Sequence, residues 1–211
     1  VSGQSPLAGM IFSALTFTVA IPSAIKVFNW VATMYKGSVS LNTPMLWALA
    51  FIAEFLIGGV TGIFLGASGT DIYLHDTYFV LAHFHYTFFP IAIIGTFAGL
   101  SFWFPKMFGR MMNDTLGKIH FWGTIIPFNC IFIPLFVLGA AGEHRRIFDY
   151  SMFSELARPE LRHLDQFATV SLLIMLSFQL VFFYNLITNL LWGPKAEKNP
   201  WQSNTLEWTA D

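Results

Sequence analysis

Charged side chains are scarce in this chain. Asp, Glu, Lys and Arg make up 11% of its 211 residues, about half the share usual in soluble domains, whereas 55% of the residues are apolar and 18% are aromatic. The net charge is −1, and no run of basic residues offers a surface for nucleic acid. We therefore expect a membrane protein with no nucleic-acid partner.

Cysteine is nearly absent as well. Cys130 is the single cysteine, so disulfides within the chain, cysteine-ligated iron–sulfur clusters and zinc knuckles are excluded. We interpret Cys130, which lies in an apolar segment, as a small buried hydrophobe. No basic stretch precedes the first apolar segment, and the first residue is Val rather than Met. We therefore expect no signal peptide, and a chain that is part of a longer polypeptide.

Long apolar runs dominate what is present. Each run is long enough to cross a hydrocarbon core about 30 Å thick, and Gly, Pro, Asn or charged residues separate them. The runs cover residues 6–34, 44–66, 77–103, 116–141 and 167–191. They predict an all-α bundle of five membrane-spanning helices over residues 1–192 and a solvent-exposed tail over residues 193–211.

The basic residues suggest an orientation. Six of them fall at one end of the predicted spans and four at the other. This bias places the loop at Ser38, the loop over residues 106–118 and the C-terminus on the cytoplasmic or matrix side. The loops over residues 71–76 and 143–163 then face outward.

His83 and His85, separated by Phe84, lie inside the third apolar run. Because a helix turns about 100° per residue, positions i and i+2 diverge by about 200° and leave opposite sides of the rod. Two packed core histidines are one interpretation. Ionisable groups at membrane depth are costly and usually functional, however, so we favour two planar cofactors flanking this helix.

Lys26 lies late in the first run, four residues after Pro22. An ammonium there costs about 3 kcal/mol on insertion scales unless it snorkels or meets water and a partner. Because proline has no backbone N–H, Pro22 leaves a carbonyl one turn earlier without its helical hydrogen bond. Ser23 lies on the same helix face as Lys26. Either Lys26 snorkels to the interface, or the two side chains form a polar path for protons.

The two outward loops carry further polar candidates. One group consists of Asp71, His75 and Asp76. These residues are a hydrated surface group, or they bind a hard divalent cation, or they make hydrogen bonds to a buried carboxylate. Arg145 and Arg146 are either interface anchors or a clamp for carboxylates such as heme propionates. Since both loops lie on one side, we expect them to converge above the histidine pair.

These residues are part of a pattern that resembles subunit I of the heme–copper terminal oxidases, cytochrome c oxidase in particular. The matching segments are Leu74–Tyr86, Ala20–Trp30, Gly58–Gly62, Lys118–Phe121 and Arg145–Arg146. The resemblance runs from near residue 1 to about residue 190. It implies that the five spans are the last five helices of a twelve-helix subunit in the bacterial inner membrane or the mitochondrial inner membrane.

The resemblance also implies roles in the membrane. His83 would be the proximal ligand of a high-spin, oxygen-binding heme, and His85 one axial ligand of a low-spin heme. Phe84 would lie between the two hemes, which we expect to be heme A. Lys26 and Ser23 would belong to the proton path named for its lysine, where the family usually has Thr in place of Ser23.

At the outer side, the resemblance assigns Arg145 and Arg146 to the heme propionates, with Asp71 bonded in the same region. His75 and Asp76 would belong to a magnesium or manganese site.

Several parts of the family's site are missing. The copper beside the high-spin heme needs three histidines, one cross-linked to a tyrosine, and these come from earlier helices. The second ligand of the low-spin heme and the acidic residues of the other proton path also come from there. With one cysteine, the dinuclear copper centre must lie on another subunit. The chain is therefore expected to act only with the N-terminal part of subunit I and with subunits II and III.

Two local differences from the family stand out. Glu143 and His144 replace a Met-Pro-like pair before the two arginines, and Glu54 stands in the second span where an apolar residue is expected. Glu54 pairs with a neighbouring subunit, stays protonated, or contacts a lipid head group, and the sequence does not choose among these.

The sequence thus predicts the C-terminal part of a proton-pumping cytochrome c oxidase, which reduces dioxygen to water with electrons from cytochrome c in a lipid bilayer. A quinol-oxidising relative is the nearest alternative, although the segment His75–Tyr78 and Tyr86 favour the cytochrome c branch. A non-catalytic two-heme electron carrier, or a cation transporter that uses Lys26 and Glu54 without a cofactor, also stays open.

Overall fold

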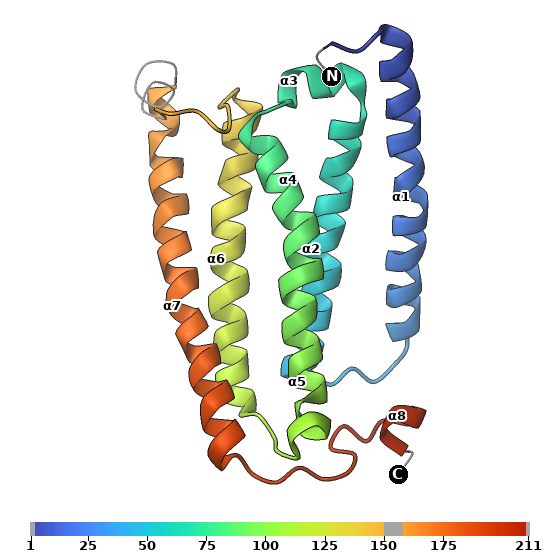
Figure 1. Cartoon of the computed structure of the whole chain (residues 1–211), viewed down its shortest axis with the longest axis vertical. Helices are drawn as coiled ribbons and strands as arrows, with labels where there is room; N and C mark the ends of the chain where they lie inside the picture. The colour runs from blue at the N-terminus through green and yellow to red at the C-terminus, as the bar shows by residue number, and fades with distance from the viewer. Residues whose placement is uncertain (1–2, 150–157, 210–211) are drawn as a thin grey trace.

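The chain folds into long, nearly parallel helices. The structure is a computed structural model that describes residues 3–149 and 158–209. Its elements are α1 (Pro6–Met34), α2 (Thr43–Gly66), α3 (Ser68–Leu74), α4 (Tyr78–Phe89), η1 (Pro90–Ile94), α5 (Gly95–Phe108), α6 (Asp114–Ala140), η3 (Pro159–Leu161), α7 (Arg162–Trp192) and α8 (Leu206–Thr209). Among the described residues, five helices are long and apolar enough to cross a membrane, and α4, η1 and α5 together make the third. The predicted all-α bundle is confirmed (Figure 1).

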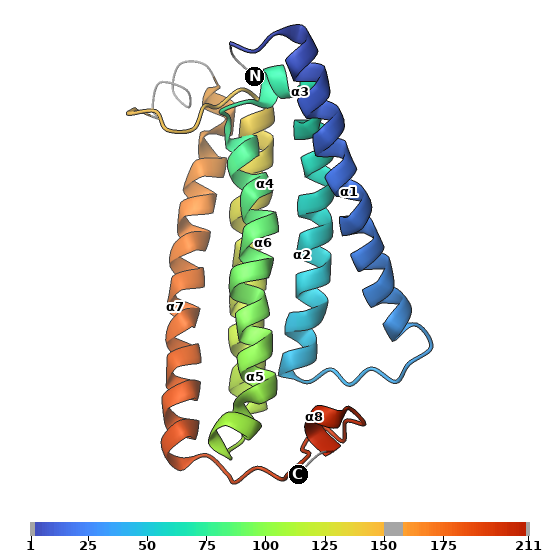
Figure 2. The same ribbon diagram turned by 45° about the vertical axis from the view of Figure 1, so that its right-hand side comes forward.

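Four of the five spans form the packed bundle, and α1 lies at its edge, in contact with α2 and α3. α1 has no buried residue and leans away from α2 toward its C-terminal end (Figure 2). The largest cluster of buried side chains lies between α4, α6 and α7 and includes Tyr86, Phe128 and Leu138. A second cluster, around Trp47 and Phe121, joins α2 to α6.

Glycines bring these helices close together. A Cβ atom on Gly139 of α6 would lie 1.9 Å from the backbone nitrogen of Phe79, and one on Gly58 of α2 would lie 2.7 Å from the carbonyl oxygen of Tyr86. Small residues allow such backbone contact in membrane bundles, where dispersion rather than the hydrophobic effect holds helices together. These glycines set the distance of α4 from both of its neighbours.

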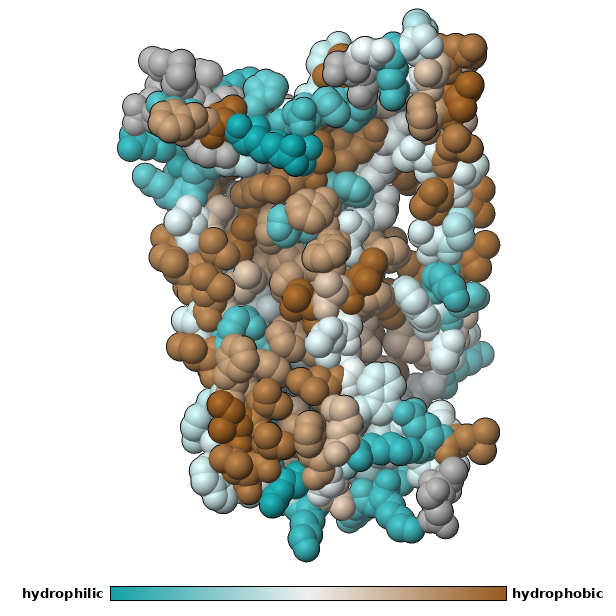
Figure 3. All heavy atoms as spheres, viewed as in Figure 1, coloured by the Kyte–Doolittle hydropathy of each residue, from teal (hydrophilic) through white to brown (hydrophobic). Residues whose placement is uncertain are grey.

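The surface has the polarity expected of an integral membrane protein. Apolar side chains form a broad middle band on the face seen in Figure 3, and polar side chains gather at both ends. Because many large apolar side chains of α1 and α7 are exposed, these helices suit contact with lipid or with other membrane helices.

The inner end, defined here as the end that carries α8, is closed by the C-terminal tail. Most residues of the tail are exposed, but Trp208 is only 5% exposed and Trp201 donates to the carbonyl of Phe102 at 2.9 Å. Trp103 and Lys106 of α5 both bond to Glu207. The tail differs from a fully solvated extension because its two tryptophans carry large apolar area that packs on α5.

The outer end, which carries α3, is closed by two joined loops. The Tyr78 amide donates to the carbonyl of Glu143 at 3.0 Å, and the Arg145 amide donates to the carbonyl of Asp76 at 2.9 Å. Thr77 forms an antiparallel bridge with His144. The two outward loops therefore converge, as their common side predicts.

Glu143 is a buried acid in this junction. Its side chain is 0% exposed, and neither carboxyl oxygen has a hydrogen-bond partner. Burial, and then the nearby carboxylate of Asp165, raises the pKa of Glu143 to about 7. The folded protein therefore holds this proton more tightly than the unfolded chain does.

We expect Glu143 to make stability fall as pH rises. The pKa of Glu143 is about 7 in the folded protein, and its ordinary value is 4.5. The contribution of neutral Glu143 to the free energy of unfolding is therefore fully present below pH 4.5 and is lost as the pH rises toward and through 7. Thermal unfolding of the intact complex should show equal midpoints for the native protein and Glu143→Gln near pH 4.5. Above pH 7 the Gln variant should unfold at the higher temperature. A gap between the two midpoints that does not change with pH would contradict this assignment.

Candidate functional site

His83 projects from α4 toward α2. Its Nδ1 lies 3.0 Å from the carbonyl oxygen of Gly58 and 3.2 Å from the hydroxyl of Thr61. Because a carbonyl oxygen only accepts, Nδ1 carries the hydrogen, and Nε2 of the neutral ring keeps its lone pair. The ring also lies against Gly62, where a Cβ atom would come within 2.8 Å of Cε1. α2 thus fixes both the tautomer and the position of this ring.

His85 leaves α4 on a different side. Its Nδ1 donates to the carbonyl of Leu81 at 2.8 Å, and its ring stacks on Phe132 of α6 with centroids 4.3 Å apart. Phe84, between the two histidines, is 41% exposed, and its ring centroid lies 4.2 Å from that of His85. The two imidazoles therefore face different helices, which is the geometry that their i, i+2 spacing predicts.

Both rings fit the role of an axial heme ligand. A metal-binding imidazole commonly donates its other ring hydrogen to a carbonyl or carboxylate, which orients the ring and leaves one nitrogen for the metal. Gly58 and Leu81 supply those carbonyls here. One helix thus presents two Nε2 atoms with free lone pairs in separate directions. This arrangement can hold two iron porphyrins, one on each nitrogen.

Arg145 lies at the junction of the outer loops. Its Nε and Nη2 both donate to Oδ1 of Asp76, at 3.1 and 2.9 Å. These hydrogen bonds from Arg145 hold the pKa of the Asp76 carboxyl below its usual value. Arg146 is exposed beside them, with a left-handed backbone at φ 63°. The structure therefore places two guanidinium groups at the outer end, one of them paired with Asp76, where the resemblance expects propionates.

Asp71, His75 and Asp76 lie in a row at the same end. His75 Nδ1 is 3.7 Å from Asp71 Oδ2, and His75 Nε2 is 3.5 Å from Asp76 Oδ2. Within residues 3–149 and 158–209, no group of three or more His, Cys, Asp and Glu side chains is arranged to hold a metal ion. His75 and Asp76 offer two ligands at most, so the magnesium or manganese site stays a prediction.

Lys26 and Ser23 lie on α1, away from the histidine pair. Lys26 is exposed, and the hydroxyl of Ser23 donates to the carbonyl of Val19 at 3.0 Å. Ser23 therefore does not fill the place at the carbonyl of Thr18, which Pro22 leaves without its usual helical donor. The proton path through these two residues stays a prediction.

Sequence reasoning noted Glu54 but missed its partners. Glu54 is 4% exposed, and its Oε1 accepts from Nδ2 of Asn129 at 2.7 Å. Oδ1 of Asn129 accepts from the hydroxyl of Tyr86, also at 2.7 Å. This burial within the chain leaves no surface for a lipid head group or a neighbouring subunit, so two of the three interpretations of Glu54 are removed.

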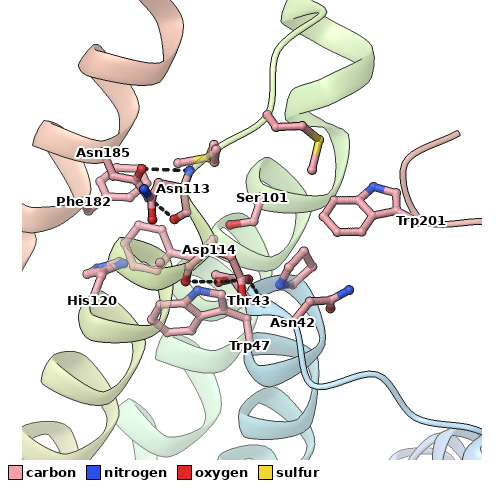
Figure 4. A pocket seen from close by; sticks show the side chains of 15 residues that line it. Asn42, Thr43, Trp47, Ser101, Asn113, Asp114, His120, Phe182, Asn185 and Trp201 are labelled. Atoms are coloured by element: carbon pink, nitrogen blue, oxygen red, sulfur yellow. Dashed lines mark hydrogen bonds between the residues drawn. The ribbon is translucent and has the colours of Figure 1, made fainter. Parts of the chain in front are cut away.

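A pocket at the inner end, lined by both aromatic and polar side chains, was also missed. It has a volume of about 110 Å³ and lies between the start of α2, α5, the start of α6 and the end of α7 (Figure 4). Thr43 donates to Asp114 through both its amide and its hydroxyl at 2.8 Å, and the amide of Asn113 donates to Asn185 at 3.2 Å. These polar groups bond to one another and tie the inner helix ends together. Asn before the first residue of a helix, as at Asn42 and Asn113, was the available signal.

Comparison with known proteins gives the family. Residues 1–177 match the family model of cytochrome c and quinol oxidase polypeptide I. The chain is 43% identical over 208 residues to the alternative cytochrome c oxidase subunit 1 of Bradyrhizobium diazoefficiens, a match that covers 99% of this chain and 35% of that protein. It is 40% identical over 207 residues to cytochrome c oxidase subunit 1 of Synechocystis sp., with 98% and 36% covered. The corresponding protein of Corynebacterium efficiens is 43% identical over 200 residues, with 93% and 33% covered.

The chain thus spans about a third of the length of the curated relatives it matches. Both the family match and the identities extend over most of its length. The chain belongs to the cytochrome c and quinol oxidase polypeptide I family, the subunit I family of the heme–copper oxidases.

Proposed function

We propose that this chain is the C-terminal part of the catalytic subunit of a proton-pumping cytochrome c oxidase, which reduces dioxygen to water with electrons from cytochrome c. The observation that carries the proposal is the pair of imidazoles on α4, each with its Nδ1 hydrogen on a backbone carbonyl and its Nε2 available. A cation transporter without a cofactor would not need this arrangement, and the family match does not support it.

The two histidines would hold two hemes, one on each side of α4. His83 would bind the high-spin heme on the side of α2, and His85 the low-spin heme on the side of α6, with Phe84 between them. The bound hemes, which we expect to be heme A, supply electron transfer and oxygen binding. Packing against Gly62 and Phe132 orients the two rings, so that neither ligand has to be ordered when its heme binds.

At the outer end, Arg145 and Arg146 would neutralise heme propionates near Asp71. Because guanidinium groups bind carboxylates through two parallel hydrogen bonds, they both position and charge-balance such groups. His75 and Asp76 would contribute ligands to a magnesium or manganese ion whose remaining ligands lie outside this chain.

The remaining parts would come from other chains. The N-terminal part of subunit I would supply the copper site beside the high-spin heme, the second ligand of the low-spin heme and the other proton path. Subunit II would carry the dinuclear copper centre, since this chain has a single cysteine. Subunit III, the lipid bilayer and cytochrome c complete the set of proposed partners.

Replacing each histidine tests the ligand roles. We expect His83→Ala to remove the high-spin heme signal and its shift with carbon monoxide, and His85→Ala to remove the low-spin signal, because each iron depends on its own ligand. Reduced-minus-oxidised spectra of the intact complex, with and without carbon monoxide, measure both. His163→Ala, which changes an exposed histidine, serves as the control and should keep both signals. Loss of only the other heme's band in each variant would reverse the assignment, and a native complex without a carbon monoxide shift would refute the oxidase.

The electron donor separates the two branches of the family. We expect the intact complex to turn over with reduced cytochrome c, because the chain carries the His75–Tyr78 and Tyr86 pattern that resembles that branch. Oxygen consumption with cytochrome c and with a quinol, measured side by side, checks this. Turnover with quinol alone would replace the proposed function with a quinol oxidase.

Lys26 is tested by separating its charge from its ability to give up a proton. We expect Lys26→Met to lower turnover severely and to leave heme content intact, because the variant has no protonatable group on the path. Lys26→Arg should also be impaired, since a guanidinium keeps its proton in proteins. Ser23→Thr, which retains the hydroxyl, is the matched control and should stay active. Normal turnover of the Arg variant would show that Lys26 only snorkels.

A further inference from the structure

Glu54 is a buried acid that the proposed mechanism does not use. It lies midway along α2 and is 4% exposed, and only one of its two carboxyl oxygens has a partner. Asn129 donates to Oε1 at 2.7 Å, whereas Oε2 is buried and has no hydrogen-bond partner. Since buried polar atoms are nearly always paired, the free oxygen requires an explanation.

The orientation of Asn129 shows where a proton would reside. Its Nδ2 donates both to Glu54 and to the carbonyl of Ile125, which lies 3.0 Å away. Because the Ile125 carbonyl can only accept, the amide nitrogen must face this side, and Oδ1 is left to accept from Tyr86. Oε1 of Glu54 is thus an acceptor, and a proton on this carboxyl would occupy Oε2.

No cation faces Glu54 from the described part of the helices packed against α2. The titratable or charged groups of these helices are Lys26 on α1, Asp71 and Tyr73 on α3, Tyr78, His83, His85 and Tyr86 on α4, Lys106 on α5, and Asp114, Lys118, His120 and Cys130 on α6. Tyr86 is joined to Glu54 through Asn129, and neither a phenol such as Tyr86 nor a thiol such as Cys130 carries a positive charge. Lys26 is exposed, and His83 meets α2 one turn away with its hydrogen on the Gly58 carbonyl.

An ionised Glu54 would therefore place half a negative charge on an oxygen with no donor, in a site without a compensating cation. A neutral acid avoids that charge and leaves only one hydroxyl unpaired. Burial penalises the charged form far more than the neutral one.

We propose that Glu54 holds a proton at neutral pH, and that this neutral carboxyl is a positioning residue for the histidine helix. It fixes Asn129, which in turn fixes the hydroxyl of Tyr86, the residue that follows His85. The ring of Tyr86 lies 6.4 Å from that of Phe132, on which His85 stacks. Glu54 on α2 is thereby joined to the proposed low-spin heme ligand through α6 (Figure 1).

Infrared spectra of the intact complex, compared between the native protein and Glu54→Gln, test directly whether Glu54 carries a proton. At pH 8 the native protein should show a carbonyl band of a carboxylic acid that shifts in D₂O and is missing in Glu54→Gln. Glu197→Gln, which changes an exposed carboxylate of the tail, should lose no such band. If the native and Glu54→Gln spectra agree in this region, Glu54 is ionised and the proposal is overturned. This measurement does not depend on the proposed heme ligation.

The reduction potential of the low-spin heme tests the positioning role, and this readout rests on the proposed function. Glu54→Gln keeps both the neutral charge and the acceptor for Asn129, so its potential should match that of the native complex. Glu54→Leu removes the acceptor and should shift the potential. If Gln raises the potential, the native residue carries a negative charge that favoured the oxidised heme, which overturns the proposal. If Leu leaves the potential unchanged, the positioning role is overturned.

Tyr86→Phe covers the case in which the Glu54 variants do not assemble. It removes only the phenol oxygen, and should shift the same potential while keeping the acid band. An unchanged potential in this variant contradicts the positioning role. A native complex that lacks a low-spin heme refutes the proposed function and leaves the infrared result on Glu54 standing.

Discussion

The arrangement of this bundle depends on hydrogen bonds that must be made inside the chain, because the membrane interior offers no water to satisfy them. His83 meets this demand through the carbonyl of Gly58 on the facing helix, and His85 through the carbonyl of Leu81 on its own helix. The first bond requires α2 and α4 to lie close, which the absence of side chains at Gly58 and Gly62 permits. Helix distance, ring tautomer and the direction of the free nitrogen are therefore set together.

The fold could be predicted from hydropathy, and the direction of the two imidazoles from helical periodicity. Helix ends were harder to predict. The third span was expected to stop at residue 103, but the helix continues to Phe108, because Pro105 and Lys106 interrupt the apolar run without interrupting the helix. Gly109, with a left-handed φ of 65°, ends it.

Long-range pairing could not be predicted in the same way. Asn129 is 75 residues from Glu54 and 43 residues from Tyr86, and which of its neighbours it meets depends on how three helices rotate against one another. The single sequence carries no record of that rotation. The outer loops were easier to place, because the alternation of spans already puts both on one side of the membrane, and only their detailed bonding was missing.

The junction of the outer loops has a practical meaning for mutagenesis. Arg145 is attached to Asp76 twice, once through its backbone amide and once through its guanidinium. The backbone attachment does not depend on the identity of the side chain, so truncating Arg145 would take away a positive charge without untying the loops. Truncation at this position therefore removes the guanidinium, with its charge and its hydrogen bonds to Asp76, while the backbone connection between the two loops is kept.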